Sequence, residues 1–309
     1  MKPKRAPQAP LQAQPLTPTD EEILRTLSTY RYMTALDVAY SLFSPNSLSH
    51  VRRILAVLSG GKDYQERQFL YRFPLPSAKA GNRERVYTLG AAGREVVESL
   101  GIPVEWYYRP SKVGRLSHSH LAHQLLLTRF VVAACSWASK HPEYTLADVR
   151  LSYDIAKSMA LLASEQGSRA ASVIPDGWLQ FERIADGVHV PILLEIDRGS
   201  EYQERLKNHL RARLEFIDSG DYERVFDTPA VIIAYATTGQ VQAYADTRRK
   251  TMAAWTMEVL TELEMESWAR VFHFTTVVYE QLYEEAQALF TAPVWYRPDS
   301  PTPVPLIPP

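Results

Sequence analysis

The chain has 309 residues, of which 46% are hydrophobic and 22% charged, and its formal net charge is −1. This length suffices for two domains with hydrophobic cores, and this composition excludes a chain that is mostly disordered. The single cysteine, Cys135, excludes a disulfide within the chain. No apolar run approaches the roughly 18 residues that span a bilayer. We therefore expect a cytoplasmic protein without a membrane segment.

The charge is distributed unevenly along the chain. Residues 1–115 contain 17 Lys and Arg against 10 Asp and Glu, a net charge of +7, whereas the remainder carries −8. A basic front half indicates that this part of the protein meets a polyanion such as double-stranded DNA.

Composition also marks the ends of the chain and a linker. Residues 1–16 are rich in Pro, Gln and Ala and predict a disordered segment. Residues 293–309 are rich in proline and predict a disordered tail, and the Pro- and Gly-interrupted stretch 103–116 predicts a linker. The two predicted domains are therefore residues 17–102 and 117–292.

Three helices open the first predicted domain. The acidic residues after Thr19 favour a helix start there, and a second short helix begins at Thr34. Ser44 followed by Pro45 is a strong start signal for a third helix, which should end at Gly60.

Two strand-like runs, 68–73 and 85–89, come next and predict a hairpin, and another helix starts near Gly93. Three helices followed by a hairpin resemble a winged helix-turn-helix, and the run 86–94 is similar to the end of the wing in that superfamily. The resemblance implies that the third helix enters the DNA major groove while the wing grips the backbone. The DNA-binding residues expected on these elements are Asn46, Ser47, His50, Arg52, Arg53, Lys79, Arg83 and Arg85. The alternative is a protein–protein module whose charges are only solvated.

The second predicted domain alternates helices and strands. A long helix is expected at 117–141, and a strand at 146–151 precedes a poorly patterned stretch. Ser200 is expected to cap a helix that follows two strands. The remaining expected elements are strands at 172–181, 189–197, 229–235 and 270–278, and helices at 246–263 and up to 289.

Three carboxylates fall on two neighbouring strands of this domain. Asp176 lies in a Pro-Asp-Gly run, and Glu195 and Asp197 share one face of the next strand because successive side chains alternate. Three hard oxygen ligands predict a divalent-metal site. The alternative is that the acids pair with Arg198, Arg205 or Arg213 and that Asp176 only caps a turn.

The order helix, three strands, helix, strand resembles the PD-(D/E)XK nuclease superfamily. Pro175-Asp176 and Glu195-Ile-Asp197 are similar to its two signature elements, although that family usually has lysine where this chain has Asp197. The resemblance implies that Asp176, Glu195 and Asp197 hold Mg²⁺, with Mn²⁺ as a substitute, and that Lys207 stabilises charge during metal-assisted phosphodiester hydrolysis.

Residues 17–290 as a whole resemble the replication-relaxation family of plasmid and mobile-element proteins. The resemblance rests on the winged helix, the Pro-Asp-Gly strand, and the run 195–201 with Lys207 downstream. It implies a role in plasmid replication or mobilisation through binding of double-stranded DNA, and DNA nicking. A second copy of the chain and replication or mobilisation proteins are candidate partners.

The predicted fold class is α+β, with an N-terminal winged helix-turn-helix domain followed by an α/β PD-(D/E)XK nuclease-like domain that has a mixed central sheet. The alternative function is a non-enzymatic transcriptional regulator whose degenerate nuclease-like domain only dimerises.

Overall fold

The computed structural model describes residues 15–60, 68–75, 84–109, 117–166, 174–199, 202–239 and 241–308. The chain divides into two compact units, Met1–Thr128 and Arg129–Pro309. The division falls inside helix α5 (His118–Ala138), whereas the sequence predicts a boundary in the linker before it. The fold class is α+β, as predicted.

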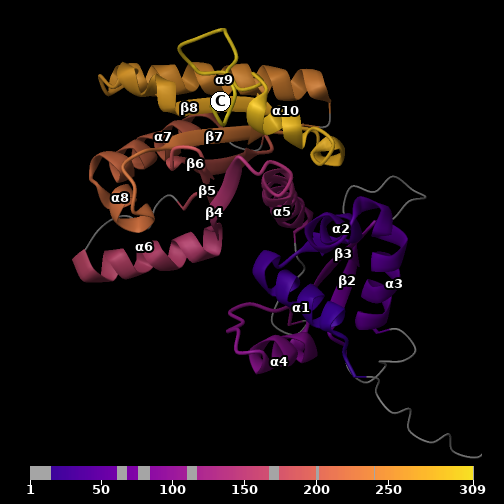
Figure 1. Ribbon diagram of the computed structural model, residues 1–309. Helices are drawn as coiled ribbons and strands as arrows, with labels where there is room; N and C mark the ends of the chain where they lie inside the picture. The colour runs from indigo at the N-terminus through magenta and orange to yellow at the C-terminus, as the bar shows by residue number, and fades with distance from the viewer. Residues whose placement is uncertain are drawn as a thin grey trace, which may run out of the picture. The chain divides into compact units, whose positions relative to one another are not determined.

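Unit 1 combines helices with a small antiparallel sheet of strand order β1-β3-β2 (Figure 1). Its buried core includes Leu24, Val38, Leu55 and Val86, all at 0% exposure. The elements before α5 are α1 (Pro18–Tyr30), β1 (Met33–Thr34), α2 (Ala35–Leu42), η1 (Pro45–Ser47), α3 (Leu48–Leu58), β2 (Leu70–Pro74), β3 (Arg85–Leu89) and α4 (Ala91–Ser99).

Capping residues fix where these helices begin. Thr17, not Thr19, is the N-cap of α1, and it forms a capping box with Asp20. Thr34 caps α2 through a buried capping box with Asp37 and also pairs with Val86 of β3. One residue therefore ties the start of α2 to the sheet, because its backbone belongs to the strand and its hydroxyl to the helix.

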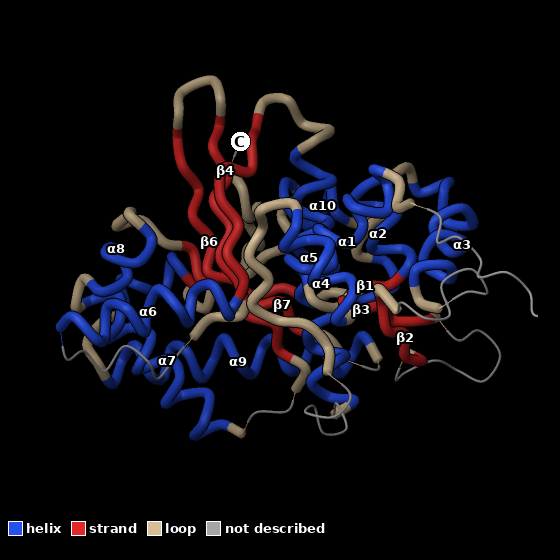
Figure 2. Tube along the Cα trace, turned by 90° about the horizontal axis from the view of Figure 1, so that it is seen from below, coloured by secondary structure: helices blue, strands red, loops and turns tan. Residues whose placement is uncertain are grey.

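Unit 2 is built on a five-stranded mixed sheet of strand order β4-β5-β6-β7-β8 (red in Figure 2). The first two pairings are antiparallel and the last two parallel. The elements after α5 are β4 (Tyr144–Leu151), α6 (Ser152–Gln166), β5 (Gly177–Arg183), β6 (Val188–Asp197), α7 (Gln203–Asp218), α8 (Asp221–Phe226), β7 (Ile232–Thr237), α9 (Gln242–Glu262), η3 (Glu266–Val271), β8 (Phe272–Thr276), η4 (Tyr279–Gln281) and α10 (Ala286–Thr291).

Different helices cover the two faces of this sheet. On one face Phe181 of β5 packs against Trp137 of α5 and Phe290 of α10, with ring centroids 5.6 and 5.7 Å apart. On the other face Trp178 and Leu193 join a buried cluster with apolar residues of α7, α8 and α9. Because side chains alternate along β6, Glu195 and Asp197 lie on the same face as Leu193.

Three segments differ from the prediction. Helix α6 occupies most of the stretch that the sequence leaves unpatterned. Helix α7 begins after Tyr202, which makes no side-chain cap, and the predicted cap Ser200 lies outside the described residues. The predicted tail folds back instead of being disordered, because Trp295, Leu306 and Ile307 are at most 1% exposed and Tyr296 bridges β8 at Phe274. The N-terminal segment predicted to be disordered lies outside the described residues up to position 14.

One helix among the described residues, α5, is long and apolar enough to cross a membrane by length and composition. However, 67% of its most apolar window is buried within the protein. Such burial is typical of a core helix, since a spanning helix would present its apolar surface to lipid.

Candidate functional site

Helix α3 and the preceding turn η1 carry the predicted DNA-reading side chains. Asn46, His50, Arg52 and Arg53 are exposed and Ser47 is half-buried. The His50 ring nitrogen Nδ1 lies 3.1 Å from a guanidinium nitrogen of Arg53. The opposite side of the helix is fully buried through Val51, Leu55 and Leu58.

Three arginines from three elements meet beside α3. Arg52 of α3, Arg72 of β2 and Arg85 of β3 line a recess of about 260 Å³ together with Tyr87. Arg52 and Arg85 are predicted DNA-binding residues, whereas Arg72 is not among them. The recess also contains Glu84, so its lining carries more positive than negative charge.

Strand pairing explains why Arg72 joins this recess. Arg72 lies directly opposite Tyr87 in the antiparallel β2–β3 pair, and Arg85 is two residues before Tyr87 on the same strand. All three side chains therefore point to one face of the sheet. The signal that could have revealed Arg72 is the hairpin register, which the sequence alone leaves open.

The pKa of Tyr87 is affected by these nearby positive charges. Burial raises the pKa of the Tyr87 phenol above its usual value, and the positive charges of Arg72, Arg85 and Arg52 oppose that rise. The three guanidinium groups lie close together and carry the same charge, so they create one region of positive potential that attracts an anion. The two other predicted wing residues, Lys79 and Arg83, lie outside the described residues.

In unit 2, the acids of β6 each face an arginine. Glu195 Oε1 lies 2.5 Å from Nη1 of Arg213, a side chain of α7 that is only 4% exposed. Asp197 accepts two hydrogen bonds, of 3.0 and 3.1 Å, from Arg248 of α9. Arg213 is one of the alternative partners that the sequence suggests, whereas Arg248 is not.

Asp176 directly precedes β5, next to the part of β6 that carries these acids. Gly177 pairs with Leu194 of β6, and one carboxylate oxygen of Asp176 accepts the backbone N–H of Ile196 at 2.8 Å. Burial alone would lower the pKa of Arg213, but the charges of Glu195 and then Asp176 help to raise it. The charges of Asp176 and Glu195 therefore both act on the Arg213 guanidinium, and the printed ion pair is with Glu195.

Lys207 is directed away from this cluster. Its Nζ lies 2.6 Å from Glu258 of α9 and 3.7 Å from Glu262. These contacts raise the pKa of the Lys207 amine, mainly through the hydrogen bond that Lys207 donates to Glu258. In this arrangement Lys207 holds α7 against α9.

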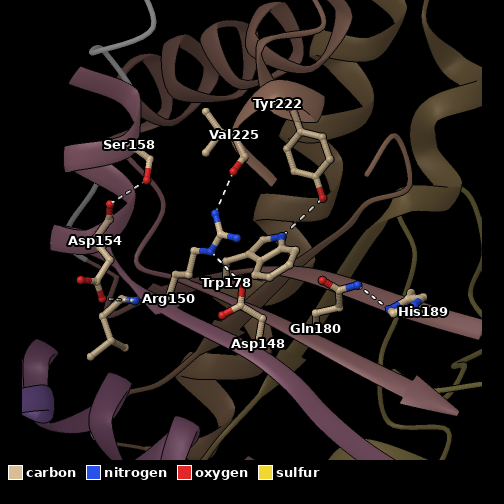
Figure 3. Close-up of polar contacts among 10 residues, drawn as sticks. Asp148, Arg150, Asp154, Ser158, Trp178, Gln180, His189, Tyr222 and Val225 are labelled. Atoms are coloured by element: carbon tan, nitrogen blue, oxygen red, sulfur yellow. Dashed lines mark hydrogen bonds and ion pairs between the residues drawn. The ribbon is translucent and has the colours of Figure 1, made fainter. Parts of the chain in front are cut away.

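A second network of contacts surrounds Trp178 of β5 (Figure 3). The Nε1–H group of buried Trp178 donates to Tyr222 Oη at 3.4 Å, and the Arg150 guanidinium lies over the Trp178 ring. Arg150 in turn donates to the carbonyl of Val225 and to Asp148. These contacts anchor the strand that directly follows Asp176.

The predicted Mg²⁺ site does not fit this geometry. Both oxygens of Asp197 are taken by a guanidinium, and Glu195 is paired with a second one. No group of three or more His, Cys, Asp and Glu side chains within the described ranges is placed to hold a metal ion. Glu195 and Asp197 instead form ion pairs with the buried arginines Arg213 and Arg248.

Unit 2 also contains a larger recess, of about 620 Å³, at the end of β8. Its charged residues are mixed in sign: Asp246 and Glu285 face it together with Arg249. Arg249 lies over the Tyr296 ring at 3.8 Å from the centroid. This recess therefore lacks the predominantly positive lining of the arginine recess in unit 1.

Comparison with known protein families identifies one match. The family described as replication-relaxation matches residues 24–228, which is more than half of the chain. The matched stretch includes α3, the arginine recess, Asp176, Glu195 and Asp197. Comparison with curated proteins and with solved structures gave no match.

Proposed function

Because this chain belongs to the replication-relaxation family, we propose that it is a DNA-binding protein that acts in the replication or mobilisation of a plasmid or another mobile element. The family itself indicates a role in replication or relaxation of such elements. The proposed DNA contact belongs to unit 1.

The architecture of unit 1 supports a winged helix-turn-helix. Helix α1, strand β1, helices α2 and α3, and the β2–β3 pair follow one another along the chain, and the three strands form one antiparallel sheet. In this reading α3 is the recognition helix, and its exposed N-terminal residues face the base edges. Asn46 and His50 are then positioned to contact bases.

The arginine recess is the observation that carries the proposal. Guanidinium groups present a planar set of N–H donors that match the oxygens of a phosphate, and they stay charged at every physiological pH. Arg52, Arg72 and Arg85 come from the recognition helix and from both strands of the hairpin. One backbone phosphate in this recess would fix α3 and the hairpin on the duplex at the same time.

The alternative, a protein-binding module, is less well supported. A protein interface would use aromatic or apolar anchors, but the outward face of α3 offers His50, Arg52 and Arg53. A cluster of exposed arginines beside a helix is typical of an electrostatic footprint for nucleic acid.

Binding of the full chain to plasmid-derived duplex DNA, followed by fluorescence anisotropy across a salt titration, tests the proposal. We expect Arg72→Ala to weaken binding to all sequences alike and to reduce the slope of log K against log salt by about one. The matched control is Arg25→Ala, because Arg25 is an exposed arginine of the same unit that pairs with Glu22 on α1.

Two outcomes would contradict the proposal. One is the absence of duplex binding by the wild-type chain at any salt concentration. The other is an equal loss of binding in Arg72→Ala and Arg25→Ala, because the recess would then contribute nothing beyond general positive charge.

A further inference from the structure

The acidic cluster of unit 2 requires a compensating positive charge. Glu195 and Asp197 share one face of β6, and Asp176 directly precedes the adjoining strand β5 and bonds to the backbone of Ile196. Carboxylates so close to an apolar interior are costly unless a cation or a basic side chain neutralises them. In a nuclease-like site that cation is a divalent metal ion.

We propose that the guanidinium of Arg213 supplies the positive charge that a divalent metal ion would supply between Asp176 and Glu195, so that this domain is assembled without metal. This inference concerns unit 2 and is independent of DNA binding by the arginine recess.

The position of Arg213 supports this role. Arg213 lies on α7 next to Leu210 and Leu214, which are at most 2% exposed and pack in the cluster that includes Leu193 of β6. The apolar contacts of α7 thus position the Arg213 guanidinium at the sheet, where its Nη1 atom lies 2.5 Å from Glu195 Oε1. A charged group with 4% exposure must have such a partner to be tolerated in a core.

Asp197, Asp176 and Lys207 also have partners within the protein. The fork of Arg248 takes both oxygens of Asp197, a bidentate geometry that fixes the carboxylate orientation. Asp176 accepts the Ile196 N–H, and Lys207 contacts Glu258. The four residues expected to form a hydrolytic centre therefore serve to join β5, β6, α7 and α9.

Manganese binding provides a direct test. Mn²⁺ is titrated into the full-length protein, and free Mn²⁺ is counted by electron paramagnetic resonance. We expect Mn²⁺ binding by the wild-type chain to be unaffected by Asp176→Asn or Glu195→Gln, because these acids hold no ion. We also expect the melting temperature of the wild-type chain to be the same in EDTA and in Mn²⁺. Stoichiometric Mn²⁺ binding that either substitution abolishes would overturn the proposal.

Removal of Arg213 provides the complementary test. In Arg213→Ala the buried Oε1 atom of Glu195 loses its guanidinium partner, so the folded-to-unfolded ratio should fall by on the order of a hundredfold. Arg211→Ala is the matched control, because Arg211 is on the same helix and its pair with Glu262 is partly exposed. That control should lose on the order of fivefold or less.

Added Mn²⁺ should restore stability to Arg213→Ala and leave Arg211→Ala unchanged, because a cation can then enter between Asp176 and Glu195. If Arg213→Ala does not fold, the double substitution Glu195→Gln with Arg213→Met removes both charges. The double variant should fold, and EDTA and Mn²⁺ should not affect it. The proposed role of Arg213 would be contradicted if Mn²⁺ failed to stabilise folded Arg213→Ala. It would also be contradicted if the double variant required a metal ion to fold.

Discussion

Buried polar side chains in unit 2 stabilise the fold through specific partners, and Tyr222 of α8 is an example. Its hydroxyl group donates to the Ala230 carbonyl at 2.8 Å and accepts from Trp178 Nε1 at 3.4 Å. Burial raises the pKa of Tyr222 to about 12, because the phenolate form would lose its hydration. The residue therefore joins α8, β5 and the segment before β7 as a neutral phenol.

We expect Tyr222→Phe to lower the free energy of unfolding by about 1–3 kcal/mol, because buried donors and acceptors lose their partner. Chemical denaturation at neutral pH measures this change.

The raised pKa means that the contribution of Tyr222 to the free energy of unfolding is fully present below pH 10 and is lost as pH rises toward about 12. Tyr222→Phe should therefore lose less stability than the wild type over this alkaline range. Tyr202→Phe is the control, because Tyr202 is 82% exposed; an equal effect of both substitutions would refute the role of the Tyr222 contacts.

At the scale of elements, close backbone packing joins α4 to the sheet of unit 1. A Cβ atom at Gly93 would meet the carbonyl oxygen of Phe69 and the side chain of Leu89, and the latter distance would be 2.7 Å. The helix can approach β2 and β3 only because residue 93 has no side chain. The glycine-containing run after β3 thus has a packing role that is separate from DNA contact.

We predict that Gly93→Ala destabilises unit 1 by about 1–3 kcal/mol, because overpacking forces the helix away from the strand. The gain in helix propensity from alanine is smaller than this cost. Thermal melting gives the measurement, with Glu95→Ala as the control at an exposed position of the same helix. A Gly93→Ala protein as stable as the wild type would show that α4 can move without penalty.

The sequence pattern predicts some elements well and misses others. The strand-like run of β3 and the apolar run of β6 are local signals, and both strands lie where they are expected, at Arg85–Leu89 and Val188–Asp197. Helix α6 escapes prediction because it buries only a narrow stripe, with Ile155 and Met159 inside and Leu161 59% exposed. A helix with so few core contacts has little periodicity to detect.

At the scale of the whole molecule, the C-terminal segment completes the core of unit 2. Tyr296 bridges the edge strand β8, and Trp295 is fully buried, with its Nε1–H donating to the Leu289 carbonyl at 2.6 Å. His273 of β8 is 7% exposed, and the charges of Arg297 and Asp299 from this segment act on it. Burial, the largest effect, lowers the pKa of His273 below its usual 6.5.

This lowered pKa predicts how the stability of unit 2 depends on pH. His273 is neutral in the folded protein and gains a proton more readily when unfolded, so its stabilising contribution is present above pH 6.5 and is lost as pH falls through the lowered value. We expect denaturation curves from pH 7 to pH 5 to show a smaller loss of stability in His273→Gln than in the wild type. His189→Gln, at an exposed position of β6, is the control variant. If His273→Gln lost more stability than the wild type between pH 7 and pH 5, His273 would be excluded as the source of this pH dependence.

The sequence by itself determines the α+β class, the basic front half, the family resemblance and the acids that share a face of β6, because these follow from composition, alternation and local motifs. Only the tertiary structure decides what those residues contact. Arg72 reaches the recess through hairpin register, Arg248 reaches Asp197 across 51 positions of the chain, and the proline-rich end packs against a strand edge. Partners of this kind are chosen by long-range packing, which no local pattern of residues encodes.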